Sequence, residues 1–207
     1  MHFEFLVEEE SAEAALNSLI PKILGPGVSF AIRRFQGKQS LLAALPQRLR
    51  GYRIRYDSGQ ISDWRIVVLI DEDRENCHDL KQQMEEIATN ERLITWTATP
   101  DKTSFQVLNR IVVEELEAWF FGDISALRRA YPKIPASLAQ KEKYRDPDAI
   151  TGGTWETLER LLKSKNYYKT GLPKIAVARL IACEMEPDDN RSKSFQVFRD
   201  ALRQAVS

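Results

Sequence analysis

The sequence predicts an α/β fold: a mostly parallel sheet flanked by helices, followed by a helical C-terminal extension. Strand-like and helix-like segments alternate through the first part of the 207-residue chain, as they do in parallel β-α-β units. Residues 66–70 form an unbroken run of branched aliphatic side chains, which is typical of an interior strand covered on both faces. After Asp123 the strand signal ends. We therefore expect an α/β domain over residues 1–123 and a helical extension packed on it over residues 124–207.

Hydrophobic periodicity predicts the elements of the first half. His2–Val7 alternates and is rich in Phe, Leu and Val, so it predicts a strand. Ser11 should be the N-cap of the helix that follows. A second strand is expected over 28–35. The leucines of 41–49 predict a second helix, which Pro46 should bend or divide because proline cannot donate the backbone hydrogen bond.

The central strand at 66–70 should be followed by a helix over 77–88 and a short strand over 93–97. The segment 105–113 is compatible with either strand or helix, and 114–121 should continue it as helix. Four helices are expected in the extension, at 124–131, 155–163, 172–186 and 194–206, with a long polar connection over 132–153.

Composition excludes several classes of protein. Lys plus Arg and Asp plus Glu both number 30, so a chain that coats DNA through overall basic charge is excluded, while a local basic groove is not. The only two cysteines, Cys77 and Cys183, cannot make a disulfide framework or a four-thiolate zinc site. No apolar run approaches the ~18 residues of a membrane span, and the early glutamates are unlike a signal peptide. We expect a cytoplasmic protein with no membrane association.

Two acidic clusters follow predicted strands. Glu8 comes directly after the first strand, and Asp71 and Asp73 come after the central one. In an open α/β sheet, the carboxyl ends of the strands line the ligand crevice. Asp71 and Asp73 would point the same way if their segment is extended. Oxygen ligands that converge in this way suit Mg²⁺ or Mn²⁺. For Glu9, Glu10 and Glu72 taken alone, the termination of strands and capping of helices is the better interpretation.

A third acidic pair, Glu115 and Glu117, could enlarge this site. In an extended segment the two side chains would share one face, whereas in a helix they would lie about 200° apart and only one could point inward. The apolar stripe around Leu116 and Trp119 favours helix. We choose Glu115 as the metal ligand, although a solvated acidic face explains the pair equally well.

Three basic residues are candidate phosphate contacts. Lys38 follows Gly37 at a predicted helix start, where backbone N–H groups favour anions. Lys174 lies near the start of a late helix, and Arg191 precedes the last one. Each of them, taken alone, is more commonly just a solvated side chain. The sequence has no Walker A motif and no G-x-G-x-x-G motif, which excludes a P-loop nucleotidase.

The chain resembles an uncharacterised Toprim-like family, domain-of-unknown-function family 4276. Through it the chain is similar to the Toprim domains of topoisomerases, primases and overcoming-lysogenization-defect nucleases. The resemblance covers nearly the whole chain and is carried by five stretches in order: residues 5–13, 37–41, 68–73, 114–120 and 190–195.

This resemblance implies a Toprim-like (Rossmann-like) fold and a role for each matched residue. Glu8 matches the Toprim glutamate, which is a general acid/base or metal ligand, and Asp71 with Asp73 matches the metal-binding Asp-x-Asp. Independently of the resemblance, we expect Lys38 or Lys174 to offset charge on the transition state. Many Toprim domains have Gly after the glutamate, where this chain has Glu9. Glu9 adds to a negative charge that repels phosphate unless metal is bound.

We therefore expect metal-dependent hydrolysis or binding of nucleic-acid phosphodiesters with Mg²⁺ or Mn²⁺. The resemblance also implies work beside a separate ATPase partner, in defence against foreign DNA. No tyrosine stands out as a topoisomerase-type nucleophile. The alternative is a non-catalytic Toprim-like scaffold that binds a protein partner. A third interpretation, an Asp-x-Asp phosphotransferase or sugar-nucleotide site, lacks any supporting motif.

Overall fold

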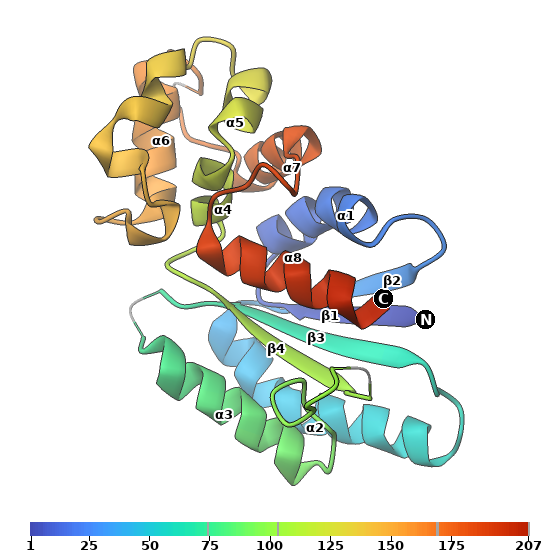
Figure 1. The fold of residues 1–207 in the computed structure, drawn as a ribbon. Coiled ribbons are helices and arrows are strands. Elements are labelled where there is room, and N and C mark those ends of the chain that lie inside the picture. Colours follow the sequence, from blue (N-terminus) through green and yellow to red (C-terminus); the bar gives the residue numbers. More distant parts are fainter. Residues whose placement is uncertain (74, 103, 169, 207) are drawn as a thin grey trace.

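The structure is a computed structural model that describes residues 1–73, 75–102, 104–168 and 170–206. Its centre is a sheet in which every strand pairing is parallel, with strand order β2-β1-β3-β4 (Figure 1). The predicted α/β class is thus confirmed. The strands are β1 (His2–Val7), β2 (Ser29–Arg34), β3 (Trp64–Asp71) and β4 (Val107–Val112).

Strand β3 is interior, as its aliphatic run predicts. It pairs with β1 on one side and β4 on the other, and residues 66–70 are all buried. Val7 of β1 is paired in register with Leu69 of β3. This register brings the carboxyl ends of the two strands together and therefore places Glu8 near Asp71.

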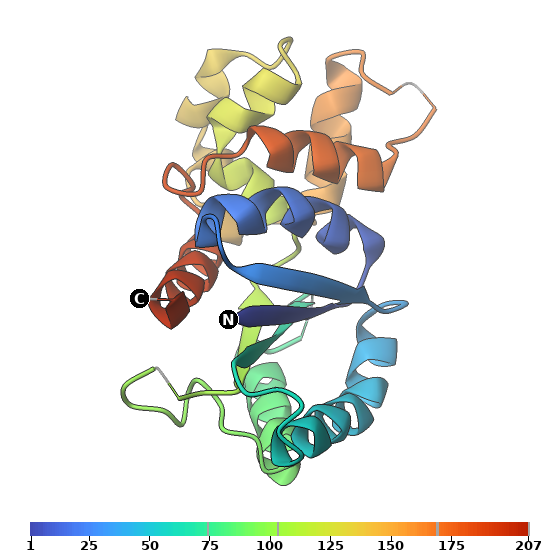
Figure 2. The same cartoon turned by 90° about the vertical axis from the view of Figure 1, so that its right-hand side faces the viewer.

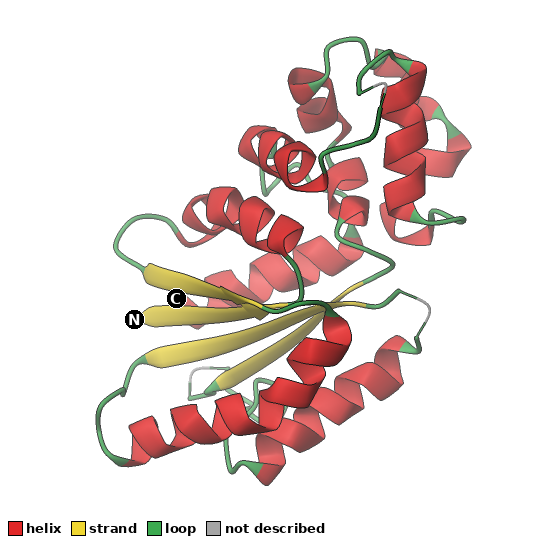
Figure 3. Ribbon diagram, turned by 180° about the vertical axis from the view of Figure 1, so that it is seen from behind, coloured by secondary structure: helices red, strands yellow, loops and turns green. Residues whose placement is uncertain are grey.

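Helices cover both faces of the sheet (Figure 3). Alternate residues of β1 separate the two layers: Phe3, Phe5 and Val7 belong to one hydrophobic cluster and Leu6 belongs to the other. This is the period-two alternation that a strand imposes. The first cluster packs under α1 (Glu10–Leu24) and α8 (Lys193–Val206), and the second under α2 (Lys38–Asp57) and α3 (Cys77–Asn90).

The residues after β4 form the predicted helical extension. Helix α7 (Lys174–Glu184) lies along α1 (Figure 2), where Lys22 Nζ donates to the carbonyls of Cys183 and Met185. Helix α8 returns to the sheet, and the Phe198 ring lies 6.4 Å from that of Phe5. A single hydrophobic cluster thus joins the extension to the sheet. The remaining elements are α4 (Glu117–Gly122), α5 (Ile124–Ala130), α6 (Thr154–Ser164) and the 3-10 turns η1 (Ala136–Gln140), η2 (Glu142–Tyr144) and η3 (Pro147–Ala149).

Two local predictions are wrong, and a third fails in one of its two alternatives. Ser11 is not the N-cap: only two residues separate the end of β1 from the start of α1, so Glu9 takes that position and the Ser11 hydroxyl donates to its carboxylate. Of the two effects expected of Pro46, a bend or a division of the helix, the division does not occur, because buried leucines on both sides of it anchor α2 to the sheet. The segment 93–97 is not a strand, since its only ladder contact is one bridge from Thr95 to Val107 and turns follow at once.

Among the described residues, no helix has both the length and the apolar character that crossing a membrane requires.

The segment 105–113, whose pattern is compatible with either strand or helix, contains strand β4. Its pairing with β3 is what makes it a strand.

Candidate functional site

The carboxyl ends of β1 and β3 bring two carboxylates into one place. Glu8 follows β1, and Asp71 is the last residue of β3. Glu8 Oε1 accepts a hydrogen bond of 2.6 Å from the backbone N–H of Asp71. The two acidic residues therefore lie side by side, as the register of the parallel sheet requires.

Both carboxylates have raised pKa values. Burial is the largest cause of the raised pKa of Glu8, and the negative charge of Asp73 raises this pKa further. The hydrogen bond from the Asp71 N–H lowers the pKa of Glu8 but does not cancel these effects. Asp71 as a residue keeps some exposure, but desolvation of its carboxylate and then the charge of Glu8 raise its pKa well above the usual range. Its one hydrogen bond that opposes this comes from Leu116 N at 3.2 Å. Because the carboxylates of Glu8 and Asp71 are neighbours, ionisation of one disfavours ionisation of the other unless a cation offsets the charge.

Glu117 is a candidate site residue that sequence reasoning did not choose. It is the first residue of α4 and only 1% exposed, yet neither of its carboxylate oxygens has a hydrogen-bond partner. Burial raises its pKa to about 7, and its charge in turn raises the pKa of Asp71. A signal was available, because Glu117 is the one charged residue in the apolar run 116–121. We call Glu8, Asp71 and Glu117 the acidic centre.

Lys174 reaches the acidic centre from the extension, at the first turn of α7. Its Nζ lies 2.7 Å from Glu9 Oε1 and 3.9 Å from Glu117 Oε1. Burial alone would lower its pKa, but Glu117, Glu9 and Asp71 together raise it. Lys174 is therefore a fixed cation. Glu9, at φ −146°, has extended backbone that needs no glycine, and its charge is offset by Lys174.

Asp73 does not point the same way as Asp71, contrary to the expectation from an extended segment. The chain leaves β3 after Asp71, and Asp73 has a positive φ of 55°. Its Oδ2 lies 2.7 Å from Lys38 Nζ. The positive φ therefore directs Asp73 toward the start of α2.

Lys38 is engaged by the loop after β3. It is 7% exposed, and its Nζ contacts the carboxylates of Asp73 and Glu75 and the carbonyl of Glu72. Burial lowers the pKa of Lys38, but these two carboxylates outweigh burial and the pKa is raised. In this arrangement Lys38 orders the loop and has no position left for a phosphate.

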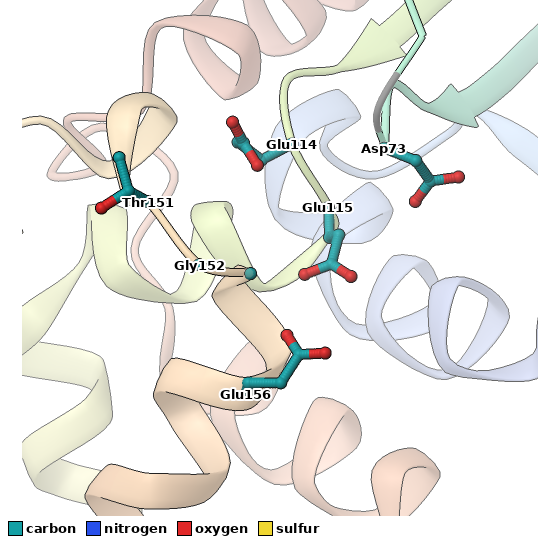
Figure 4. Close-up of a pocket in the computed structure, with 7 residues that line it drawn as sticks. Asp73, Glu114, Glu115, Thr151, Gly152 and Glu156 are labelled. Atoms are coloured by element: carbon teal, nitrogen blue, oxygen red, sulfur yellow. The ribbon is translucent and has the colours of Figure 1, made fainter.

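Glu115 lies beside the acidic centre. Its Oε2 accepts hydrogen bonds of 2.9 Å from Thr154 Oγ1 and from Trp155 N, so it holds the start of α6. It also lines a pocket of about 600 Å³ with three further carboxylates (Figure 4), those of Asp73, Glu114 and Glu156. In Figure 4 the carboxylates of Glu115 and Glu156 point toward one another. We call this space the acidic pocket.

Arg191 makes its contacts elsewhere. Its backbone N–H donates to Gly122 O and its Nη2 to Tyr144 O, both in the extension. Its neighbours Ser192 and Ser194 bind the Asp148 carboxylate. This stretch therefore fastens the start of α8 to the extension, and nothing places Arg191 at the acidic centre.

No preformed metal site is present: within the described ranges, no three His, Cys, Asp or Glu side chains are arranged to hold a metal ion. The acidic centre nevertheless offers only oxygen donors, which suit Mg²⁺ and Mn²⁺. Lys174 is a single positive charge beside three carboxylates, and the raised pKa values of Glu8 and Asp71 and the lack of hydrogen bonds to the Glu117 oxygens fit a centre whose negative charge is only partly offset. The donor set thus fits a hard divalent cation after side-chain adjustment.

Comparison with known proteins identifies a family for this chain. The model of a family described as a domain of unknown function (DUF4276) matches residues 7–203. No match was found among curated proteins or among solved structures. The matched range includes the acidic centre, the acidic pocket and nearly all of the helical extension. The chain therefore belongs to the DUF4276 family.

Proposed function

We propose that this protein hydrolyses or binds nucleic-acid phosphodiesters in a metal-dependent manner at the acidic centre. The observation that carries the proposal is the convergence of Glu8, Asp71 and Glu117 in a buried position, with Glu117 lacking any hydrogen-bond partner. Burying carboxylates without partners costs several kcal/mol. Perturbed groups of this kind gather at functional sites.

Each residue has a part in this proposal. Glu8, Asp71 and Glu117 would hold Mg²⁺ or Mn²⁺, and the cation would polarise the phosphate and lower the pKa of bound water. Lys174 supplies a fixed positive charge beside the carboxylates, suited to offset negative charge that develops on the phosphate. Lys38 holds Asp73 and the loop between the acidic centre and the acidic pocket.

The resemblance to Toprim domains supports the same function. By this resemblance, the glutamate after β1 and the Asp-x-Asp at the end of β3 would correspond to the metal-binding carboxylates of Toprim enzymes. By the same analogy we propose a separate ATPase partner and a nucleic-acid substrate.

A scaffold that binds a protein partner is the second candidate. Two observations favour it: the described residues contain no preformed group of metal ligands, and both candidate lysines already make ion pairs. In this alternative the acidic centre would have no catalytic role, and the helical extension would bind the partner protein.

The test is cleavage of a nucleic acid by the Asp71→Asn variant. Asn keeps the shape and the acceptor for Leu116 N but removes the negative charge. With Mn²⁺ and any ATPase encoded alongside, we expect wild-type cleavage and loss of at least 100-fold in the variant. The control Asp57→Asn changes an exposed carboxylate at the end of α2 and should cleave like wild type. If wild type and Asp71→Asn are equally inactive while the partner still binds, the scaffold is the correct function.

A further inference from the structure

A groove lies between α2 and the β1–β2 edge of the sheet, on a different surface from the acidic pocket. It has a volume of about 790 Å³. One wall is a face of α2 on which Ala44, Arg48, Gly51 and Arg55 recur at intervals of three or four residues, the spacing of one helix face. A Cβ atom added at Gly51 would meet no atom within 4 Å. We call this space the α2 groove.

The two arginines that helix α2 contributes to the groove, Arg48 and Arg55, are not neutralised by carboxylates. Arg48 lies over the Phe35 ring at 5.8 Å and Arg55 over the Trp64 ring at 4.6 Å. Neither makes an ion pair within the described part of the chain. Stacking holds a guanidinium in place while leaving its planar N–H groups able to bind phosphate.

The one carboxylate in the groove is already satisfied. Glu4 is 3% exposed and accepts hydrogen bonds of 2.9 Å from Tyr52 Oη and from Arg33 Nε. His2 Nε2 lies 3.4 Å from its other oxygen. Glu4 therefore fixes Arg33 at the base of the groove and adds little free negative charge.

The same helix carries two further arginines that differ in this respect. Arg50 makes two hydrogen bonds with the Glu91 carboxylate, and Arg53 makes an ion pair with Asp57. Neither lines the groove. Helix α2 thus separates arginines without carboxylate partners, which face the groove, from arginines that are paired.

We propose that the α2 groove binds the phosphate backbone of a nucleic-acid strand. This inference rests on the proposed function and assigns the surface that would hold the nucleic acid. Arg48 and Arg55 lie about 10.5 Å apart along the helix axis, or about three nucleotide rises of 3.4 Å. Helix α2 starts at Lys38, which contacts Asp73 in the acidic pocket. A strand held along α2 would lead toward the acidic centre, whose own negative charge repels phosphate.

The test is binding of a fluorescent 20-nucleotide strand, measured by anisotropy in EDTA from about 50 to 200 mM salt. For Arg48→Gln with Arg55→Gln we expect at least tenfold weaker binding. We also expect a slope of log K against log salt reduced by about 1.4, since each single-strand phosphate contact contributes about 0.7. The matched control, Arg50→Gln with Arg53→Gln, removes the same charge from the same helix and should bind within twofold of wild type.

A second variant tests the groove without removing an arginine. Gly51→Glu adds a carboxylate on the groove face of α2, where the new Cβ has no atom within 4 Å, and should weaken binding by a similar factor. Thermal melting of each variant checks that the fold is kept.

Three results would overturn the inference: no binding by wild type, equal loss in both double variants, or displacement by poly-glutamate as efficient as by unlabelled strand. The last would assign the groove to an acidic protein. Because binding is measured without metal, loss of Mn²⁺-dependent cleavage in Asp71→Asn leaves it unchanged. Groove binding without any cleavage by wild type would reject hydrolysis and retain the groove.

Discussion

At the scale of single residues, Glu117 contributes to the pH dependence of folding. Its pKa is about 7 in the folded protein against 4.5 for an ordinary glutamate. Between these values the folded state binds more protons than the unfolded state, so the free energy of unfolding falls as pH rises. At about 1.4 kcal/mol per pKa unit, the loss between pH 4.5 and 7 is up to about 3 kcal/mol.

Replacing Glu117 by Gln should remove this loss. We expect Glu117→Gln to be more stable than wild type above pH 7 and to show a shallower decline from pH 4.5 to 7. The measurement is urea unfolding in EDTA at several pH values. The control Glu86→Gln alters an exposed side chain on α3 and should follow the wild-type profile. Equal slopes in wild type and Glu117→Gln would show that Glu117 is ionised throughout.

The sequence identifies some site residues and misses others for a physical reason. Glu8 and Asp71 are predictable because each ends a strand, and parallel strands bring those ends to one edge. Glu117 depends on where α4 begins, which tertiary packing decides. The direction of the Asp73 side chain cannot be predicted from the sequence, because the sequence does not reveal the positive φ of this residue.

At the scale of elements, replacing two helical glycines by alanine should change the free energy of unfolding in opposite directions. A Cβ on Gly122, the last residue of α4, would overlap the Asn190 side chain. That amide cannot move freely, since it donates to Trp119 O and accepts from Ser192 N. Gly122→Ala should therefore lower the free energy of unfolding by about 1–3 kcal/mol.

Gly51→Ala is the matched substitution. Gly51 lies inside α2 with nothing within 4 Å of an added Cβ, so alanine should raise the free energy of unfolding by about 0.5–1 kcal/mol. Urea unfolding of both variants gives the comparison. A stable Gly122→Ala would mean that the joint between α4 and the start of α8 is loosely packed.

Elements were predictable where local pattern and long-range pairing agree. The aliphatic run of β3 indicates both its state and its interior place. The segment 93–97 has a strand-like composition but makes only one bridge, because strand formation requires a partner along its length. The segment that forms β4 was ambiguous until its pairing with β3 was known. Pairing of this kind is a property of the whole chain.

At the scale of the whole molecule, the acidic centre joins the sheet to the extension. Glu8 and Asp71 come from strands, Glu117 from α4 and Lys174 from α7. The same two parts share one hydrophobic cluster. The sequence predicts an extension packed on the α/β domain but does not reveal that α7 brings a lysine to the carboxylates. Because the centre spans both parts, its charge balance affects the stability of the entire fold.

This arrangement predicts that a divalent cation stabilises the protein. A ligand that binds only the folded state adds about 1.4 kcal/mol at ten times its dissociation constant, which corresponds to about 3–6 °C in the melting temperature of a chain this size. We expect Mn²⁺ to raise the melting temperature of wild type, and more at pH 8 than at pH 6, because protons compete with the cation for carboxylates whose pKa values are raised.

The Asp71→Asn variant separates cation binding from simple charge relief. Without metal it should melt above wild type, since it removes repulsion from Glu8 and keeps the acceptor for Leu116 N. With Mn²⁺ it should gain little, because Asp71 is one of the proposed ligands. Differential scanning calorimetry in EDTA and in millimolar Mn²⁺ measures both effects, and Asp57→Asn serves again as the surface control. A wild-type melting temperature that Mn²⁺ does not change would count against a metal at the acidic centre. An equal shift in wild type and Asp71→Asn would place the cation elsewhere, with the four carboxylates of the acidic pocket the next site to test by substitution.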